Sequence, residues 1–592
     1  MVSIACELTA DRQRIVLVAG GGHAEDVAQA AKRLQTLTPL FEKSDPPGAL
    51  VTAATWPAVV QLEATFGAQL VKGPALQAWI NAEAERRITA MGNPLSYQPP
   101  AGLAPYAWQI AGAAMIAATG AALITDEPGT GKTITAILGL VERATATLNP
   151  RPALVICPAS VVDSWVEAWQ AWAPHVRTVA WRGPKRDQLL GTADVYVTSY
   201  DLAWRDAPAG GTKAMRPLIE LAPAHVVIDE CHLIKNHQTN RSKAVRRLAK
   251  GASTVVALSG TPITHHPGDL WPALEALEHG AWPARGRWVE RYCTTLPGDY
   301  REDILGLAPH AEPEFRLTLL GQHRRVAKAD VLSQLPPKVY SVRTVDMPAK
   351  WRKVYDDFES QMLAELPDGS ELQVMDVMSM FTHLSGLACS AADVRVELGP
   401  DVDERTGLPK RHVHLDLKAP SWKVEALLEV LAERPGEPVV AFAPSRQLVM
   451  LAGAAAEAEG LRVGYVVGGQ AAGVRTAAVN AFQAGELDLL CVTTSAGGVG
   501  ITLTAARTVV FLQRPWSLVE SIQAEDRCHR IGSEVHDSIE VIDVVTRDSI
   551  DTRVRAVLRE RAGQLADLVQ DPRIVAELLG GSNVTRTERK SA

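Results

Sequence analysis

The sequence of 592 residues contains few cysteines and no excess of basic residues. Its seven cysteines stand singly at positions 6, 157, 231, 293, 389, 491 and 528, without a CxxC pair. This spacing excludes a disulfide scaffold and gives no zinc signature, so a reducing cytosol is the expected compartment. Lysine and arginine number 60 against 67 acidic residues, which argues against a uniformly basic nucleic-acid binder. A chain of net charge −7 can still concentrate positive charge in one groove.

Long hydrophobic runs are also missing. No stretch reaches the roughly 18 uncharged apolar residues that suggest a membrane span, so no membrane association is expected. The first ten residues include Glu7 and no basic region, so a secretory signal is not expected either. Hydrophobic residues make up 47% and charged residues 21%, as in folded globular proteins. At about 150 residues per domain, the length predicts roughly four domains.

The pattern of strands and helices predicts an α/β organisation. Residues 1–95 are expected to form a small module, with strands at 14–18 and 50–53 and helices at 25–35 and 74–87, the last opening at Pro74. A proline-rich linker follows at 93–105. Apolar strands then alternate with helices in 96–275 and again in 421–570, which predicts two parallel sheets. Residues 276–420 are expected to be a mostly helical or irregular insertion, and 571–592 a polar tail.

A glycine-rich loop lies between an apolar strand at 121–125 and an apolar helix at 134–140. Its sequence is Asp126-Glu127-Pro128-Gly129-Thr130-Gly131-Lys132-Thr133. The full P-loop pattern has glycine at the position of Asp126, so the match is incomplete. The part that binds phosphate is present. Gly129 and Gly131 let backbone N–H groups face phosphate oxygens, Lys132 supplies a charge for the β- and γ-phosphates, and the Thr133 hydroxyl can ligate Mg²⁺.

An acidic pair, Asp229 and Glu230, ends the predicted strand at 225–228. In a parallel sheet this end of a strand faces the ligand crevice. Asp229 can hold Mg²⁺ through water, and Glu230 can orient and deprotonate the attacking water. A solvated strand end is the alternative interpretation, and the preceding glycine-rich loop disfavours it. Cys231 and His232 are not expected to bind a metal, because adjacent side chains on a strand diverge.

These two motifs together resemble helicase superfamily two, with DECH in the DEAH position. In that resemblance Gln109 corresponds to the adenine-reading glutamine, and Ser160 and Thr198 lie in segments similar to DNA-contacting motifs. Residues 258–263, Leu-Ser-Gly-Thr-Pro-Ile, are very similar to the coupling motif of the Swi/Snf branch. Departures from the branch are Pro128, Thr130 and the pair His265-His266.

The second half extends the Swi/Snf resemblance. Residues 495–506 resemble the branch's "AGGxGxNLTxA" motif, with Gly500 as a phosphate-approaching glycine and Thr502 for asparagine. Residues 523–533 resemble "QAxxRxHRIGQ", with Ser533 for the final glutamine. Arg527 and Arg530, three residues apart, are expected to share a helix face and to act on the γ-phosphate. Segments 324–338 and 421–423 resemble the branch's "RR…DVL…LPPK" and "SGK" segments.

The resemblance implies a fold of two RecA-like lobes that use ATP and Mg²⁺. It implies ATP-driven movement along double-stranded DNA, forked or branched forms included, with backbone contacts from Ser160, Thr198 and Thr494. The expected location is the cytoplasm, associated with DNA. The short first module, with Trp56-Pro57 after a strand, is most similar to the annealing-helicase (HARP-bearing) subgroup. Two alternatives stay open: a strand-separating DNA or RNA helicase, and a catalytically idle DNA-binding scaffold.

Two other features favour structural roles. Trp165, Trp169 and Trp172 have helical spacing, which favours core packing over a base-stacking platform. The basic clusters at 243–247 and 410–412 are expected to be solvated surface, with DNA tracking as the alternative.

Overall fold

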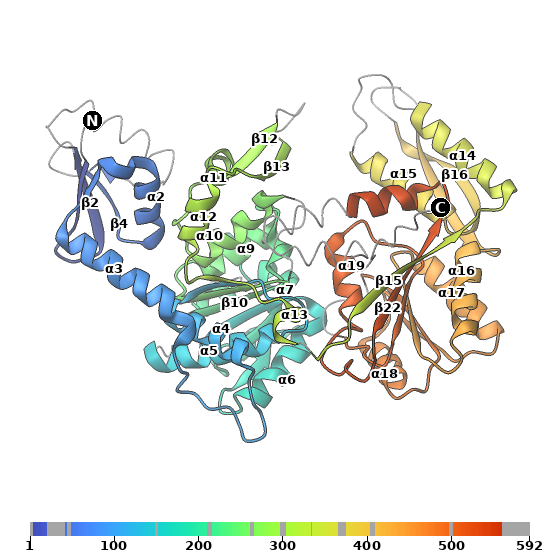
Figure 1. Ribbon diagram of the computed structural model, residues 1–592, viewed down its shortest axis with the longest axis horizontal. Helices are drawn as coiled ribbons and strands as arrows, with labels where there is room; N and C mark the ends of the chain where they lie inside the picture. The colour runs from blue at the N-terminus through green and yellow to red at the C-terminus, as the bar shows by residue number, and fades with distance from the viewer. Residues whose placement is uncertain are drawn as a thin grey trace, which may run out of the picture. The chain divides into compact units, whose positions relative to one another are not determined.

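The computed structural model describes residues 4–19, 42–43, 49–147, 152–209, 216–260, 266–296, 303–332, 334–364, 374–402, 409–495 and 501–558. The chain divides into two compact units, Met1–Val331 and Leu332–Ala592 (Figure 1). Within the described residues, no helix combines the length and apolar composition that a bilayer crossing requires.

The first 92 residues contain a five-stranded sheet of order β3-β4-β2-β1-β5. The strands are β1 (Ile4–Leu8), β2 (Arg14–Ala19), β3 (Glu42–Lys43), β4 (Ala49–Ala53) and β5 (Leu70–Lys72), and the helices are α2 (Trp56–Phe66) and α3 (Pro74–Thr89). The predicted strands at 14–18 and 50–53 are confirmed, as is the start of a helix at Pro74. β1 was not predicted, although it alternates buried and partly exposed residues as a half-buried strand should. The helix predicted at 25–35 lies outside the described residues.

The larger sheet of the first unit has the order β14-β6-β11-β10-β7-β9-β8, and each strand pairs in parallel with its neighbours. Its strands are β6 (Ala121–Ile124), β7 (Ala153–Cys157), β8 (Thr178–Ala180), β9 (Val195–Ser199), β10 (His225–Asp229), β11 (Thr254–Leu258) and β14 (His323–Arg324). Between them run α4 (Ala107–Thr119), α5 (Lys132–Thr147), α6 (Val162–Trp172), α7 (Tyr200–Arg205), α8 (Pro217–Glu220), α9 (Asn240–Ala249) and α10 (Trp271–Leu277). Every residue of the four central strands β11, β10, β7 and β9 is buried, as a sheet covered on both faces requires.

The second unit contains a six-stranded parallel sheet of order β15-β22-β21-β18-β20-β19. The strands are β15 (Lys338–Val345), β18 (Val439–Ala443), β19 (Val463–Val466), β20 (Leu489–Thr493), β21 (Thr508–Phe511) and β22 (Ile539–Thr546). The helices are α14 (Ala349–Ala364), α15 (Val374–Leu387), α16 (Trp422–Glu433), α17 (Arg446–Ala458), α18 (Ala472–Gln483) and α19 (Leu518–Glu525). Together with the first unit's large sheet, it gives the expected class of two parallel-sheet α/β lobes.

The expectation of a mostly helical or irregular segment at 276–420 needs correction. Besides α11 (Arg285–Tyr292), α12 (Glu312–Thr318) and α13 (Lys328–Val331), it contains the hairpins β12 (Cys293–Leu296)–β13 (Asp303–Leu307) and β16 (Ala391–Val402)–β17 (Pro409–Lys418). It also supplies β14 to the first large sheet and β15 to the second. β14 is only two residues long and β15 buries none of its eight residues, so neither strand leaves a clear hydrophobic pattern in the sequence.

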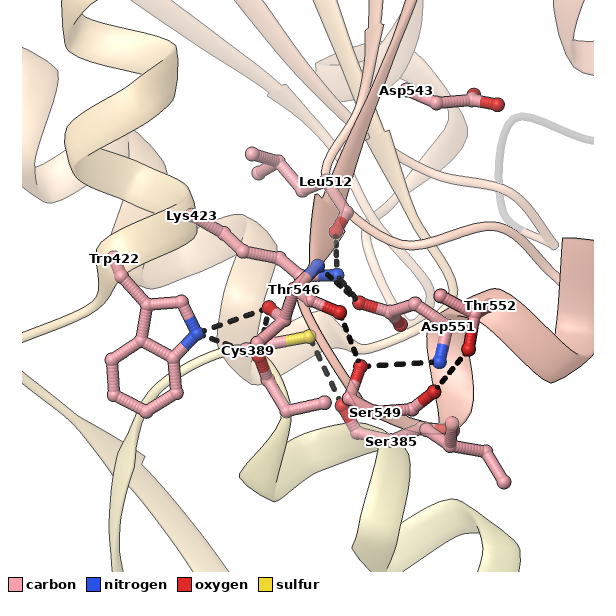
Figure 2. A network of polar contacts seen from close by, with 12 residues as sticks. Ser385, Cys389, Trp422, Lys423, Leu512, Asp543, Thr546, Ser549, Asp551 and Thr552 are labelled. Atoms are coloured by element: carbon pink, nitrogen blue, oxygen red, sulfur yellow. Dashed lines mark hydrogen bonds and ion pairs between the residues drawn. The ribbon is translucent and has the colours of Figure 1, made fainter. Parts of the chain in front are cut away.

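A buried polar network joins three segments of the second unit (Figure 2). Lys423, at the start of α16, is fully buried, and its ammonium contacts the Asp551 carboxylate at 2.6 Å and donates to the Leu512 carbonyl at 2.9 Å. Burial by itself lowers the pKa of Lys423, but the carboxylate more than offsets this and raises the pKa above its usual value. The Asp551 carboxylate also accepts from the backbone N–H of Thr546 at 2.9 Å. The lysine of the "SGK"-like segment is therefore a core residue of the second unit.

Replacing one partner of this ion pair is expected to be far more damaging than replacing both. Asp551→Asn leaves the Lys423 charge buried without a counterion, and should lower the free energy of unfolding by about 3 kcal/mol. Adding Lys423→Met removes that charge and should restore part of the loss. Urea unfolding, followed by tryptophan fluorescence, gives the free energy of unfolding of Asp551→Asn, of Lys423→Met and of the double variant. A double variant as unstable as the sum of the two single variants would contradict the assignment.

Candidate nucleotide-binding site

The glycine-rich loop lies between β6 and α5, at the carboxyl edge of the first unit's large sheet. Gly129 and Gly131 have φ of 87° and 84°, a left-handed conformation that glycine adopts without steric cost. A Cβ at Gly131 would lie 2.2 Å from Nε2 of Gln109, so this glycine is also needed for close packing. The loop therefore has the backbone form that turns N–H groups towards an anion.

Lys132 begins α5, and its ammonium donates to the Asp126 carbonyl at 2.7 Å and the Glu127 carbonyl at 3.1 Å. The ammonium thus lies over the loop where a phosphate would be held. Thr133 is the next residue of the same helix and is half-buried. Lys132, predicted to bind phosphate, and Thr133, predicted to bind Mg²⁺, therefore lie in the first turn of α5.

Gln109 packs against this loop from α4. Its side-chain amide donates to the Thr130 carbonyl at 3.2 Å and accepts from the Tyr106 N–H at 3.0 Å. Trp108 donates to the same Thr130 carbonyl at 3.0 Å and stacks on Tyr106, with 4.3 Å between ring centroids. Gln109 therefore lies beside Thr130 of the loop, with its amide bonded to protein groups.

Asp229 and Glu230 end β10, next to β11 and β7 in the same sheet. Both carboxylates are buried, and both are close enough to Lys132 for its charge to lower their pKa values. Burial and the Glu230 charge nevertheless raise the pKa of Asp229. For Glu230, burial is outweighed by His232 and Lys132, so its pKa is lowered and it stays anionic. Glu230 also adopts φ of 54°, a strained conformation for a residue with a Cβ, of the kind found at functional sites.

His232 and Ser259 hold the Glu230 carboxylate. Ser259, which follows β11, donates from Oγ to Glu230 Oε2 at 3.3 Å, and His232 Nδ1 lies 3.2 Å from the same oxygen. His232 Nδ1 is also 3.1 Å from Ser259 Oγ, so the three side chains form a triangle. This links the acidic motif to the Ser-Gly segment of the predicted coupling motif. Residues 261–263 of that motif lie outside the described residues.

Trp165 contacts the predicted Mg²⁺ site directly, a role that the sequence did not suggest. Its indole N–H donates to Asp229 Oδ2 at 2.8 Å, and both side chains are buried. Trp169 is equally buried one turn later on α6, but its indole N–H has no hydrogen-bond partner in the described ranges. The prediction of core packing is confirmed for these two residues. The hydrogen bond of Trp165 was not foreseeable, because Trp165 and Asp229 are 64 residues apart in the sequence.

Asp126, the residue that departs from the strict P-loop pattern, forms a buried ion pair with Arg324. Arg325 approaches the neighbouring Glu127, with 3.4 Å between its terminal nitrogen and the carboxylate. Burial raises the pKa of Asp126, and the Arg324 charge opposes that rise. The "RR" segment and the glycine-rich loop are thus joined by two charge pairs, which explains an acidic residue at this position.

The second unit holds Arg527 and Arg530 in turns after α19, which ends at Glu525. The expectation that they share a helix face is wrong, because the helix stops before either residue. Arg527 is buried and donates to the Thr494 carbonyl at 3.4 Å, while its other terminal nitrogen has no hydrogen-bond acceptor among the residues that the structure describes. Burial, followed by the charge of Arg530, lowers its pKa to about 10.

A set of ion pairs fixes the turns that carry these arginines. Lys338, from the "LPPK"-like segment, lies 3.3 Å from Glu525 and 3.1 Å from Asp526. Arg514 binds Glu525 at 2.6 Å, and His529 contacts the Pro336 carbonyl at 2.8 Å. β15 and the segment before it therefore brace the arginine-bearing turns.

The three residues predicted to contact DNA differ in their exposure to solvent. Ser160 is exposed in the turn after β7. Thr198 is fully buried in β9 with its hydroxyl 3.4 Å from the Trp181 carbonyl, and Thr494 is buried after β20. Neither threonine hydroxyl is placed to contact a phosphate at the surface, so those two predictions are corrected. Gly500 lies outside the described residues.

The basic cluster at 243–247 is partly structural. Arg246 lies over the Trp271 ring, 5.1 Å from its centroid, and donates to the His237 carbonyl at 2.8 Å. Arg247 donates to the Ala207 carbonyl. Two of the three basic side chains of this cluster, Arg246 and Arg247, therefore make contacts within the first unit. The side chains of 410–412 lie outside the described residues.

A cavity of about 660 Å³ lies at the opposite edge of the sheet from the glycine-rich loop. Its lining includes Ala153, Val195 and His225, which are the first residues of β7, β9 and β10. The glycine-rich loop and Glu230 follow the ends of their strands, and Asp229 is the last residue of β10. This cavity is therefore separate from the candidate nucleotide site.

Residues 79–392 match the family model described as the SNF2-related domain, and residues 422–532 match the helicase conserved C-terminal domain. The chain belongs to the SNF2-related family. The Swi/Snf resemblance of the motifs is thereby confirmed, and the chain carries an SNF2-related domain and a helicase C-terminal domain.

Several curated relatives share about a quarter of their aligned residues with this SNF2-family chain. It is 27% identical over 482 residues to TATA-binding protein-associated factor mot1 of Aspergillus fumigatus, covering 73% of this chain and 25% of that protein. It is 28% identical over 454 residues to the SWI/SNF-related matrix-associated actin-dependent regulator of chromatin subfamily A-like protein 1 of Xenopus tropicalis, covering 75% and 42%. The alignments thus cover a quarter of the length of the first relative and less than half of the length of the second. The Sulfolobus solfataricus SWI2/SNF2 ATPase core in complex with dsDNA matches with 20% identity and a TM-score of 0.36, over 81% of this chain and 99% of that one.

Trp165→Phe is expected to lower the affinity of the site for Mg²⁺. The variant keeps an aromatic ring but loses the N–H that orients Asp229, and loss of such an outer contact costs about tenfold in metal affinity. The Mg²⁺ concentration for half-maximal phosphate release from ATP should therefore rise, while Trp169→Phe, whose indole N–H has no partner, should change it little. Equal effects of the two substitutions would show that packing, rather than the hydrogen bond, matters.

Proposed function

We propose that this chain is a DNA-dependent ATPase that uses ATP hydrolysis to move along double-stranded DNA. The observation that carries the proposal is the convergence of Lys132, Asp229 and Glu230 at one edge of a parallel sheet in an SNF2-family chain. A cation, a metal-binding acid and an anionic base are the groups that phosphoryl transfer to water requires.

The first unit supplies the nucleotide-binding groups. The backbone N–H groups at Gly129 and Gly131 and the ammonium of Lys132 would bind the phosphates, and Gln109 would lie near the base. Mg²⁺ would be held by Thr133 and, through water, by Asp229, where it would neutralise charge on the phosphate oxygens. The fit to Mg²⁺ rests on the donor set, a hydroxyl and a carboxylate oxygen, which is the chemistry that this ion prefers.

Glu230 acts as the base that orients water and accepts its proton. Its lowered pKa keeps it anionic, and the Ser259 and His232 contacts fix the carboxylate. Arg527 and Arg530 of the second unit would stabilise negative charge as the γ-phosphate leaves, a contribution worth about 10³–10⁵ in rate. The Arg527 nitrogen that lacks an acceptor within the described part of the chain supports this role, because a buried donor without a partner costs free energy unless a ligand uses it.

Double-stranded DNA is the proposed partner, bound mostly through its phosphates, forked or branched forms included. Such contacts carry little sequence information. Ser160 is the predicted contact whose side chain is exposed, in the turn that follows β7. With a net charge of −7, the chain must gather its DNA-binding cations locally, so binding should weaken as salt increases. With this partner, the proposed location is the cytoplasm, associated with DNA.

Lys132→Ala should abolish DNA-stimulated phosphate release, by about a hundredfold or more, because the phosphates lose their main charge partner. Lys185→Ala, at an exposed position in the same unit, serves as the matched control and should release phosphate as the wild type does. A Lys132→Ala variant with full DNA-stimulated activity would refute the assignment of the glycine-rich loop.

Translocation and strand separation are distinguished by two displacement assays on the wild-type chain. A protein that moves along an intact duplex removes the third strand of a triplex without opening the duplex. We therefore expect ATP-dependent triplex displacement and no unwinding of a blunt or tailed duplex. Unwinding without triplex displacement would favour a strand-separating helicase, and absence of ATP hydrolysis with retained DNA binding would favour an idle scaffold.

A further inference from the structure

Among its contacts with the rest of the first unit, the N-terminal module touches Leu317, Leu320 and Gly321, at the start of a segment that runs to residue 328. Trp56, at the start of α2, donates its indole N–H to the Leu317 carbonyl at 2.8 Å. Arg87, on α3, donates to the Leu320 carbonyl at 3.0 Å, and the Leu320 side chain packs against the core of the module. Trp56 and Arg87 are both buried, with the guanidinium 5.4 Å from the centre of the indole ring. The contact is therefore directional as well as apolar.

The fit at this contact is close. Gly321 has φ of 70°, and a Cβ there would lie 2.7 Å from the backbone oxygen and Cβ of Arg87. Arg87 is itself fixed by Glu83, one turn earlier on α3, at 2.7 Å. Because the segment and α3 approach without room for a methyl group, the segment cannot shift at this end without disturbing the module.

The other end of the 317–328 segment holds the glycine-rich loop. The N–H groups of Leu123, Thr125 and Glu127 donate to alternate carbonyls of the segment, at 2.7, 2.8 and 3.0 Å. These bonds, which include the pairing of β14 with β6, continue into the first residues of the loop. The segment therefore fixes the strand and the loop residues that precede Gly129.

Side chains reinforce this backbone pairing. Arg324 forms the buried ion pair with Asp126, and the backbone N–H of Lys328 donates to the Glu127 carboxylate at 2.8 Å. The carbonyls of Asp126 and Glu127 in turn accept from the Lys132 ammonium at 2.7 and 3.1 Å. A continuous set of contacts therefore runs from the N-terminal module to the phosphate-binding lysine.

We propose that Trp56 and Arg87 are positioning residues for the nucleotide site, acting through the 317–328 segment on the glycine-rich loop. The module would keep the segment seated, and the segment would keep the loop in the form that binds phosphates. Trp56 lies before the residues matched by the SNF2-related family model, so this chain adds an anchor outside the matched domain. The inference rests on the proposed function, since it takes the loop to be the nucleotide site.

The effect on the loop itself can be measured without nucleotide, by hydrogen exchange of the full chain. Trp56→Phe keeps an aromatic ring over Arg87 but removes the N–H bound to Leu317. The amides of Leu123, Thr125 and Glu127 should then exchange about fivefold faster, because the carbonyls that protect them are less firmly held. Trp79→Phe is the matched control: Trp79 packs on the same module core from α3, and none of the hydrogen bonds described joins it to the 317–328 segment. Unchanged exchange in Trp56→Phe, or equal change in both variants, would overturn the proposal.

The effect on ligand binding is measured with N-methylanthraniloyl-ADP as the probe. Trp56→Phe should raise its dissociation constant by about fivefold, and Arg324→Lys, which loses the two-pronged bond to Asp126, should raise it further. Because both substitutions act on one chain of contacts, the dissociation constant of the double variant should rise by less than the product of the two single factors. Independent, multiplicative effects would contradict the shared route.

Arg87→Lys provides a second test if Trp56→Phe does not fold. It retains the charge next to Glu83 but cannot satisfy both Glu83 and the Leu320 carbonyl with the same geometry. It should produce the same exchange pattern at the three amides.

A wild-type chain that binds no nucleotide would refute the proposed function. Normal binding in wild type with unaltered amides in Trp56→Phe and Arg87→Lys would remove only this inference.

Discussion

Parallel pairing of β6, β11 and β10 is the constraint on which the proposed chemistry depends. Strands that run in one direction end at one edge, so the residues that follow them meet although they are far apart in the sequence. β6 brings the glycine-rich loop, β10 brings Asp229 and Glu230, and β11 brings Ser259. Pro128 of the loop lies so close to Gly260, after β11, that a Cβ there would be 2.6 Å from its ring.

Buried charges in both units are placed in pairs. Arg324 with Asp126 holds the loop, Lys338 with Glu525 holds the arginine-bearing turns, and Lys423 with Asp551 joins α16 to the segment after β22. Such pairs are costly to desolvate and add little net stability, but they fix geometry because losing one partner leaves an uncompensated charge. Sites that must align charged groups with phosphate oxygens benefit from fixed geometry more than from added stability.

The sequence predicted the elements that carry strong local signals. Buried five-residue strands, the Gly-x-Gly-Lys-Thr loop and a helix opening at Pro74 follow from hydrophobic runs and from the backbone preferences of glycine and proline. Contacts between distant segments gave no such signal. The bond from Trp165 to Asp229, the pairing of Arg324 with Asp126 and the burial of Thr198 depend on which strands become neighbours. The helix expected to carry Arg527 ends earlier because tertiary ion pairs around Glu525 and Asp526 fix the turn there.

The rate of phosphate release by the full chain, measured against the length of added blunt duplex DNA, tests the central claim most directly. A duplex-tracking ATPase should hydrolyse ATP slowly without DNA. Its rate should increase with duplex length until binding and dissociation no longer limit it, and should fall as salt weakens the phosphate contacts. A rate that is the same without DNA and with duplexes of every length would contradict the account.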